Sequence, residues 1–271
     1  MTAYDQLKIA RHPKRLTSRG VIKTLFPDFL ELHGDRQFKD DLSIIGGIAT
    51  FKQHTVTIIA QEKGIDTEDK IKHNFGMPHP EGYRKALRLM KQAEKFKRPI
   101  ITIIDTPGAY PGVGAEARGQ AQAIANNLKE MMGLKTPVIV VVLSEGGSGG
   151  ALAIGVGDVI LMFEHAIYSV LSPEGFASIL YKDAKRAPEA AELMKITSKD
   201  LKEMSIIDDI IKEGPGLHEN VDIGLSQLSQ HLEKHLDSLS HKPIKRLLMS
   251  RYEKFRQMGT ILERVSDESS N

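Results

Sequence analysis

Two apolar runs in this chain each end in a glycine-rich loop, and this pairing limits the possible folds more than any other feature. Residues 99–104 lead into 105–112, and residues 138–143 lead into 144–150. Both runs are short and almost wholly apolar, which is typical of strands buried on both faces of a parallel sheet. A helical pattern over 115–134 separates them. The order predicts a right-handed parallel α/β unit whose two loops open at the same edge of the sheet.

The second loop, 144–150, has four glycines in its last five positions. A strand that ends there and restarts as a helix brings bare backbone N–H groups to one point, because glycine permits close approaches that a Cβ would block. Such a point can bind an anion. Three kinds of anion stay open at this stage, namely a phosphate, a tetrahedral intermediate and an enolate.

The overall composition argues against several other classes of site. The 271 residues include 37 Lys and Arg against 35 Asp and Glu, so the net charge is only +2 and nucleic-acid binding is not predicted. With no cysteine and no His-Glu-x-x-His pattern among ten histidines, we expect no disulfide and no metal site in this chain. No apolar run approaches the ~20 residues that span a bilayer, and we expect a cytoplasmic location.

The remaining segments predict one large domain with a helical arm and a tail. We expect a basic N-terminal arm over 1–24, the main domain over 25–265 and a disordered tail over 266–271. The arm is expected to be solvated, and contact with a phosphate or a partner is the alternative. Residues 65–79 are charged and read as a loop. The other predicted elements are helices over 20–32, 80–93, 221–239 and 243–262, and strands over 44–49, 56–60, 159–163 and 166–171.

Two classes of chemistry suit the second glycine loop. Residues 146–150 match the Gly-x-Ser-x-Gly elbow of serine hydrolases, with Ser148 as nucleophile, although a run this rich in glycine produces the pattern easily. The alternative is enolate chemistry, in which backbone donors stabilise developing oxyanions at about 3 kcal/mol each. The hydrolase would need a later Asp and His, and the available pairs are Asp158 with His165 and Asp208 with His218.

Longer stretches make the second class specific, because they resemble the carboxyltransferase alpha subunits of bacterial acetyl-CoA carboxylase. The resemblance covers nearly everything from residue 25 to residue 252. Its main motifs are DTPGAYPGVGAE at 105–116, EGGSGGALAIGVGD at 145–158 and YSVLSPEG at 168–175, supported by FLELHGDR at 29–36, GGIA at 46–49, NFGMP at 74–78 and PEGYRKA at 80–86.

This resemblance implies a crotonase-like α/β fold, a superhelix of ββα turns with a helical N-terminal arm and a helical C-terminal region. It implies transfer of a carboxyl group from carboxybiotin, on the biotin carboxyl carrier protein, to acetyl-CoA, which gives malonyl-CoA for fatty acid synthesis. It also implies an α2β2 heterotetramer with a zinc-bearing beta subunit, working with biotin carboxylase in an ATP-binding complex. Biotin would be attached to the carrier and not to this chain. A subunit that binds CoA or biotin without catalysis is a further alternative.

The resemblance also implies roles for individual loop residues. One of the two glycine pairs, 146–147 or 149–150, should donate amides to the ureido oxygen of biotin, and which pair does so stays open. The biotin nitrogen itself is implied as the base. The implied oxyanion donors are Gly146, Gly147, Gly149 and Gly150, and the implied carboxybiotin pocket comprises Gly108, Ala109, Tyr110, Gly112, Ser148 and Ala151.

Basic side chains are the candidates for the phosphates of CoA. Lys63, Arg84 and Lys85 are possible contacts, with solvated side chains as the simpler interpretation. Ile65 and His73 stand where the family carries basic residues, so no phosphate contact is expected from those two positions.

Overall fold

The computed structural model describes residues 1–259, and it is built on an eight-stranded mixed sheet. Strands follow the order β1-β2-β3-β4-β5-β6-β8, and β7 pairs with residues 145–147 at the C-terminal end of β5. The pairs β1–β2 and β2–β3 are antiparallel, whereas all pairs from β3 onward are parallel. The strands are β1 Leu30–Glu31, β2 Ile44–Phe51, β3 His54–Gln61, β4 Ile100–Thr106, β5 Val138–Gly147, β6 Val159–Phe163, β7 Ile167–Ser169 and β8 Asp209–Ile211.

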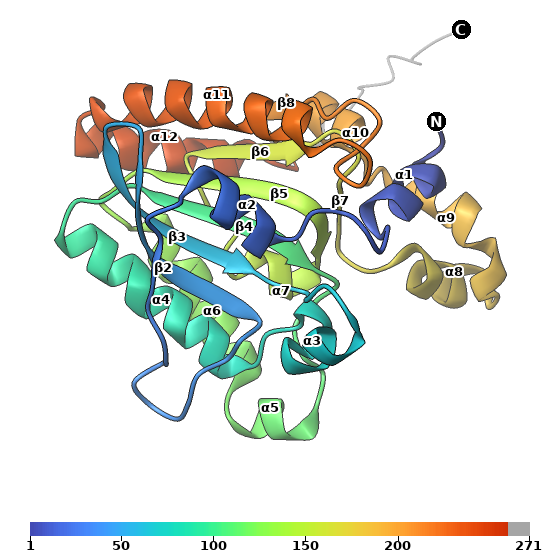
Figure 1. The fold of residues 1–271 in the computed structure, drawn as a ribbon. Helices are drawn as coiled ribbons and strands as arrows, with labels where there is room; N and C mark the ends of the chain where they lie inside the picture. Colours follow the sequence, from blue (N-terminus) through green and yellow to red (C-terminus); the bar gives the residue numbers. More distant parts are fainter. Residues whose placement is uncertain (260–271) are drawn as a thin grey trace, which may run out of the picture.

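Helices cover both faces of this sheet (Figure 1). Helices α4 and α6 lie along one face, and α2 and α11 lie along the other. A group of helices, α1, α8 and α9, stands at one side of the sheet. The helices are α1 Ala3–Ala10, α2 Ser18–Leu25, α3 Thr67–Lys72, η1 Asn74–Gly76, α4 Pro80–Lys95, α5 Val113–Ala117, α6 Gln120–Met132, α7 Ser148–Leu152, α8 Pro173–Tyr181, η2 Ala184–Arg186, α9 Ala187–Met194, α10 Ser198–Glu203, α11 Val221–Ser240 and α12 Ile244–Gln257.

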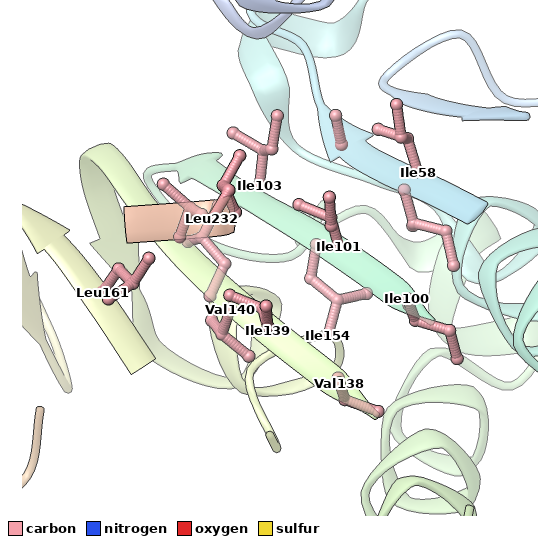
Figure 2. Packing of buried hydrophobic residues seen from close by; sticks show 14 of the residues in the cluster. Ile58, Ile100, Ile101, Ile103, Val138, Ile139, Val140, Ile154, Leu161 and Leu232 are labelled. Carbon is pink, nitrogen blue, oxygen red and sulfur yellow. The ribbon is translucent and has the colours of Figure 1, made fainter. Parts of the chain in front are cut away.

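The central strands β4 and β5 are buried at every position, as the apolar runs predicted. Ile101 pairs with Ile139 across the parallel ladder. Figure 2 shows these residues in the main apolar cluster, which also includes Ile154 after α7 and Leu232 of α11. Burying such side chains contributes about 1.5–3 kcal/mol each, so this double-sided burial anchors the two loops that follow the strands.

The predicted parallel α/β unit is confirmed. Three predicted segments differ from the structure for a physical reason. The predicted helix 20–32 ends at Leu25, because Pro27 follows closely and cannot continue it. The predicted helix 115–134 is divided by Gly119, whose φ of 86° is left-handed. The predicted loop 65–79 contains α3, which has no buried residue and so shows no apolar period.

The charge of the N-terminal arm predicted a solvated segment, but parts of the arm are buried against the rest of the chain. Helix α1 packs against α9, and the Ala3 amide donates to Glu192 at 2.7 Å. Arg15 is 5% exposed and forms two bonds to the Glu213 carboxylate, at 2.7 and 2.9 Å. A fully paired guanidinium can be buried, so basic residues in this arm serve tertiary structure as well as solubility.

Helix α12 is anchored by one buried arginine. Arg251 is fully buried and donates to both oxygens of Asp158, at 3.0 and 2.6 Å. Its other N–H groups donate to three carbonyls, those of Met131, Leu134 and Thr136. All five donors are therefore satisfied.

The expected tail 266–271 and the end of the predicted helix 243–262 lie outside the described residues. Within 1–259, no helix is long and apolar enough to cross a membrane.

We expect Arg251→Ala to lower the free energy of unfolding by about 3–5 kcal/mol, because it removes the cation paired with the buried Asp158 carboxylate and one donor from each of three carbonyls. Denaturant unfolding monitored by circular dichroism measures this. The matched control is Arg246→Ala, an exposed arginine on the same helix, which should change the value by no more than about 0.5 kcal/mol. Equal effects from the two variants would contradict the anchoring role.

Candidate active site

The two glycine-rich loops lie in direct backbone contact at the carboxyl ends of β4 and β5. A Cβ on Gly147 would fall 2.1 Å from the carbonyl oxygen of Pro107, and one on Gly150 would fall 2.4 Å from the carbonyl carbon of Gly108. Real Cβ atoms do not approach backbone so closely, so these two positions require glycine. The loops were expected to open at the same edge of the sheet, and at these residues they touch.

The other loop glycines have different surroundings. A Cβ on Gly146 would meet the Tyr168 ring at 2.7 Å, and one on Gly112 would meet the Tyr110 ring at 2.4 Å. Gly149 has room, since the nearest atoms to its Cβ position are methyl groups of Ile124 at 3.7 Å or more. Gly108 has no neighbour within 4 Å of that position, but its φ is +154°. The glycine loops therefore combine packing requirements with open positions.

The four candidate oxyanion glycines divide into two structural pairs. Gly146 and Gly147 belong to β5 and pair with Tyr168 and Ser169 of β7. Gly149 and Gly150 lie in the first turn of α7, whose N-terminus receives no hydrogen bond from a capping side chain. First-turn amides have no partner within their own helix, so the second pair is better placed to donate to a ligand.

Ser148 lies at the junction between β5 and α7 with a φ of 51°, and its side chain is exposed. With Gly149 it lines a largely apolar cavity of 380 Å³. The other lining residues are Leu152, Gly155, Ile160, Tyr168, Ser169, Val170, Leu201, Ile206, Phe255 and Met258. Ser148 and Gly149 thus border an opening that could accept an apolar ring.

Gln61, the last residue of β3, forms hydrogen bonds to both loops. The sequence alone did not predict this role. Its side-chain amide donates to the Gly150 carbonyl at 2.7 Å and accepts from the Asp105 N–H at 3.2 Å. Because the side chain is fully buried, both bonds form away from water. Nothing in the local sequence marks this residue, since its partners lie 89 and 44 residues away.

A buried charge network lies behind the loops. Lys63 Nζ is 2.6 Å from Asp105 Oδ1 and 3.6 Å from Glu145 Oε2. Arg11 donates to Glu145 at 2.7 Å and to Glu174 at 2.9 Å. The network therefore connects the loop after β3, the strands β4 and β5, the N-terminal arm and α8.

Burial and these contacts shift the pKa values of Glu145, Asp105 and Lys63. Burial alone would raise the pKa of Glu145, but Lys63 and Arg11 outweigh it and lower that pKa. Burial raises the pKa of Asp105 despite Lys63, while Asp105 and Glu145 overcome burial and raise the pKa of Lys63. Glu145 thus contributes stability above its unfolded pKa, near ~4.3, and this contribution is lost as the pH falls through the lower folded value.

The three basic candidates for CoA phosphates are all paired within this chain. Lys63 belongs to the network above, Lys85 is 1% exposed and lies 2.5 Å from Asp40, and Arg84 lies 2.8 Å from Asp35. Of these, Arg84 alone lines the 650 Å³ cavity between α4 and the start of α6, where Arg36, Arg88 and Arg118 also lie. Lys63 and Lys85 have carboxylate partners and do not line this cavity, so they are poorer phosphate candidates than Arg84.

The candidate pocket residues are not all at an open surface. Ala151 is fully buried in the main core and cannot line a pocket. Tyr110 stacks on His79, with ring centroids 4.1 Å apart, and its amide donates to the Pro78 carbonyl. Ala109 packs with the small apolar cluster around Tyr83. These contacts fix the shape of the first loop, with its outer part from 107 to 112 at least partly exposed.

The proposed hydrolase partners lie away from Ser148 or are bound elsewhere. The Asp158 amide donates to Val138, the first residue of β5, so Asp158 lies about 30 Å along that strand from Ser148. Its carboxylate binds Arg251, and Asp208 binds Lys254. His165 bonds the Gly214 carbonyl, and the His218 ring packs against that of His12 at a tilt of 38°. Within residues 1–259 neither candidate Asp–His pair forms a triad with this serine.

Comparison with solved structures identifies the fold. Transcarboxylase 12S, with hydrolysed methylmalonyl-coenzyme A bound, superimposes with a TM-score of 0.71 at 20% identity, over 88% of this chain and 45% of that chain. A Pseudomonas malonate decarboxylase hetero-tetramer in complex with coenzyme A gives a TM-score of 0.68 at 17% identity, over 86% of this chain and 92% of that chain. The fold is therefore the crotonase-like fold of carboxyltransferases, as predicted.

Sequence comparison then identifies the family. The family model described as acetyl co-enzyme A carboxylase carboxyltransferase-like matches residues 1–259. Carboxyl transferase subunits alpha of acetyl-coenzyme A carboxylase are 57% identical in Halalkalibacterium halodurans, over 94% of this chain and 79% of the relative, and in Clostridium beijerinckii, over 96% of both. The chain belongs to this family of carboxyltransferase alpha subunits. An alpha subunit implies a beta-subunit partner, and both solved relatives are multi-subunit assemblies.

The contacts of the glycines separate positions that look alike in sequence. We expect Gly147→Ala and Gly150→Ala each to lower the free energy of unfolding by about 1–3 kcal/mol or more, because the new Cβ would overlap the backbone of the first loop. Gly149→Ala has room and should be neutral or slightly stabilising, since alanine favours helix. Thermal melting of the three variants measures this, and equal losses would contradict the loop contact.

We expect Lys63→Met to lower the free energy of unfolding at pH 7 by about 3–5 kcal/mol, since it leaves the Asp105 and Glu145 carboxylates short of a cation. Burial already raises the pKa of Asp105, and without Lys63 that pKa should lie further above its unfolded value, so the deficit should shrink as the pH falls toward 5. Urea unfolding at the two pH values measures this.

The matched control is Lys72→Met, because Lys72 is exposed and its pairing with Glu68 lies at the surface. We expect a change of no more than about 1 kcal/mol, with little dependence on pH. A Lys63→Met deficit that stays constant from pH 7 to pH 5 would exclude the buried charge network as its cause.

Proposed function

We propose that this chain is the alpha half of a carboxyltransferase that moves the carboxyl group of carboxybiotin to acetyl-CoA, giving malonyl-CoA for fatty acid synthesis. Family membership over residues 1–259 carries this proposal. Carboxybiotin, attached to a biotin carboxyl carrier protein, supplies the carboxyl group. In this reaction the N–CO2 bond breaks, a bond forms to the acetyl methyl carbon, and the proton of that carbon passes to the freed nitrogen.

The surroundings of Ser148 and Gly149 fit the biotin ring. A ureido oxygen needs N–H donors, and the first-turn amides of Gly149 and Gly150 have no capping side chain. The bicyclic ring needs an apolar wall, and the 380 Å³ cavity provides Leu152, Tyr168 and Val170. We therefore assign the oxyanion donors to Gly149 and Gly150, with Gly146 and Gly147 as the strand residues that position them.

The remaining loop residues would act by support. Gln61 bonds the Gly150 carbonyl and the Asp105 amide, so it maintains the relative position of the two loops. The bond from Gly108 N–H to the Thr106 hydroxyl, at 3.0 Å, fixes the start of the first loop. A preorganised donor set needs no rearrangement as charge develops on the ureido oxygen, and this is how such a site lowers a barrier.

The site would be completed by other chains. We infer an α2β2 assembly in which the beta subunit contributes the acetyl-CoA side and carries the zinc of the family, with the carrier protein and biotin carboxylase as further partners. Support comes from the pairing of Lys63 and Lys85 with carboxylates, which leaves these two candidates without a free charge for CoA phosphates. Arg84 and the basic cavity that it lines stay as the CoA candidate in this chain.

Reconstitution tests the function and the donor assignment together. This chain, mixed with its beta partner, acetyl-CoA and the carboxylated carrier, should form malonyl-CoA only when both subunits are present. Gly149→Val should lower that rate by about 100-fold, because it places bulk where the ring must sit while the fold has room for it. Product formation is followed by chromatography, with thermal melting to show that the variant is folded.

Ser148→Ala is the matched control at the adjacent position, and it should keep the carboxyltransferase rate, because the proposal uses no hydroxyl nucleophile. A serine hydrolase would instead lose its activity in this variant, and the wild-type serine would react with a fluorophosphonate. Labelling of Ser148, with no malonyl-CoA formed by the complete mixture, would refute the transferase. An unchanged rate in Gly149→Val would refute the donor assignment and favour a subunit that binds without catalysing.

A further inference from the structure

Three metal-binding side chains converge at the edge of the sheet, away from the glycine loops. His231 and His235 lie one turn apart on α11, and Asp209 begins the edge strand β8. One ligand atom from each lies within 4.8 Å of the other two. Residues four apart project from the same face of a helix, so both imidazoles point to the carboxylate that β8 presents.

Distances show that these groups do not satisfy one another by hydrogen bonds. His231 Nδ1 is 3.6 Å from Asp209 Oδ2, and His235 Nε2 is 3.9 Å from the same oxygen. Both ring nitrogens are buried without a hydrogen-bond partner. Leaving such atoms unpaired costs about 1–3 kcal/mol each, so their convergence on one point calls for an explanation.

A bound transition-metal ion would account for this spacing. Ligand atoms about 2.1 Å from a tetrahedral zinc ion are separated by about 3.4 Å, which is close to the 3.6 and 3.9 Å found here. Imidazole nitrogens with one carboxylate oxygen suit zinc and its neighbours, whereas magnesium and calcium prefer oxygen ligands. Asp209 is one-third exposed, so a water molecule can occupy the fourth position.

Two nearby cations act against an ion at this position. Lys234 Nζ is 3.8 Å from Asp209 Oδ2, and Lys202 Nζ is 3.7 Å from Asp209 Oδ1. Lys234 is 68% exposed on a flexible stem, so it can move into solvent when an ion binds.

We propose that His231, His235 and Asp209 form a binding site for one zinc-type divalent ion, which fastens α11 to the edge strand β8. The expectation of no metal in this chain rested on thiolates and the His-Glu-x-x-His pattern, and this site uses neither. An ion that binds the folded state alone stabilises it, so occupancy should raise the melting temperature. The site does not depend on the carboxyltransferase reaction.

Calorimetric titration of the full chain, first stripped with a chelator, tests the proposal. Zn²⁺ should bind at one equivalent and raise the melting temperature, whereas Mg²⁺ should do neither. His231→Ala and His235→Ala should each weaken Zn²⁺ binding by more than about tenfold, since even second-shell changes cost that much. His241→Ala, at the exposed end of the same helix, is the matched control and should leave binding unchanged.

Lys234→Ala is a second test that does not depend on the histidine variants. It should fold normally, because it removes only an exposed side chain. It should tighten Zn²⁺ binding by removing a positive charge beside the ligands. Absorption of bound Co²⁺ in the visible range gives a second readout of coordination by the histidines. Absence of saturable binding at one equivalent would overturn the proposal, as would undiminished binding in both His231→Ala and His235→Ala, or weaker binding in Lys234→Ala.

Discussion

The backbone contact between the two glycine-rich loops is the constraint on which the site depends. Gly147 and Gly150 touch Pro107 and Gly108 so closely that no side chain fits between them. This contact is possible because β4 and β5 are adjacent parallel strands, which deliver both loops to the same edge of the sheet. The close contact leaves Gly149, which has room around it, beside the open cavity. Gly147 and Gly150 thus serve packing, and Gly149 serves access.

Charge pairing gives the loops a second support, and it reaches far along the chain. Arg11 and Lys63 both contact Glu145, just before the glycines, while Arg15 bonds Ser144 and Glu213. Each buried ion is satisfied by partners from other segments, which is what makes its burial tolerable. The N-terminal arm is therefore part of the framework behind the active-site loops, and its basic residues do not need an external anion to explain them.

The sequence was informative where burial imposes a pattern and uninformative where it does not. Strands β4 and β5 are buried at every position, so their apolar runs predicted them. Helix α3 buries none of its residues and is stabilised by the Asp66 cap and the Lys72–Glu68 pair, so no periodicity marked it. The sequence did not predict the roles of Gln61 or of the cluster of His231, His235 and Asp209, because these roles come from contacts between distant segments. The motifs around Ser148 identified the family but not the separate roles of its glycines.

By itself, the amino-acid sequence determined the order of buried strands and glycine loops, and with it the carboxyltransferase family. The order follows from local composition, because an apolar run must be buried and a glycine run permits backbone that other residues forbid, and the family follows from the resemblance of the longer motifs. Only the tertiary structure decided which glycines pack and which stay open, which basic residues are already paired, and which histidines meet an aspartate. Those outcomes depend on distances between residues tens to hundreds of positions apart, and the packing of the sheet and its helices sets those distances.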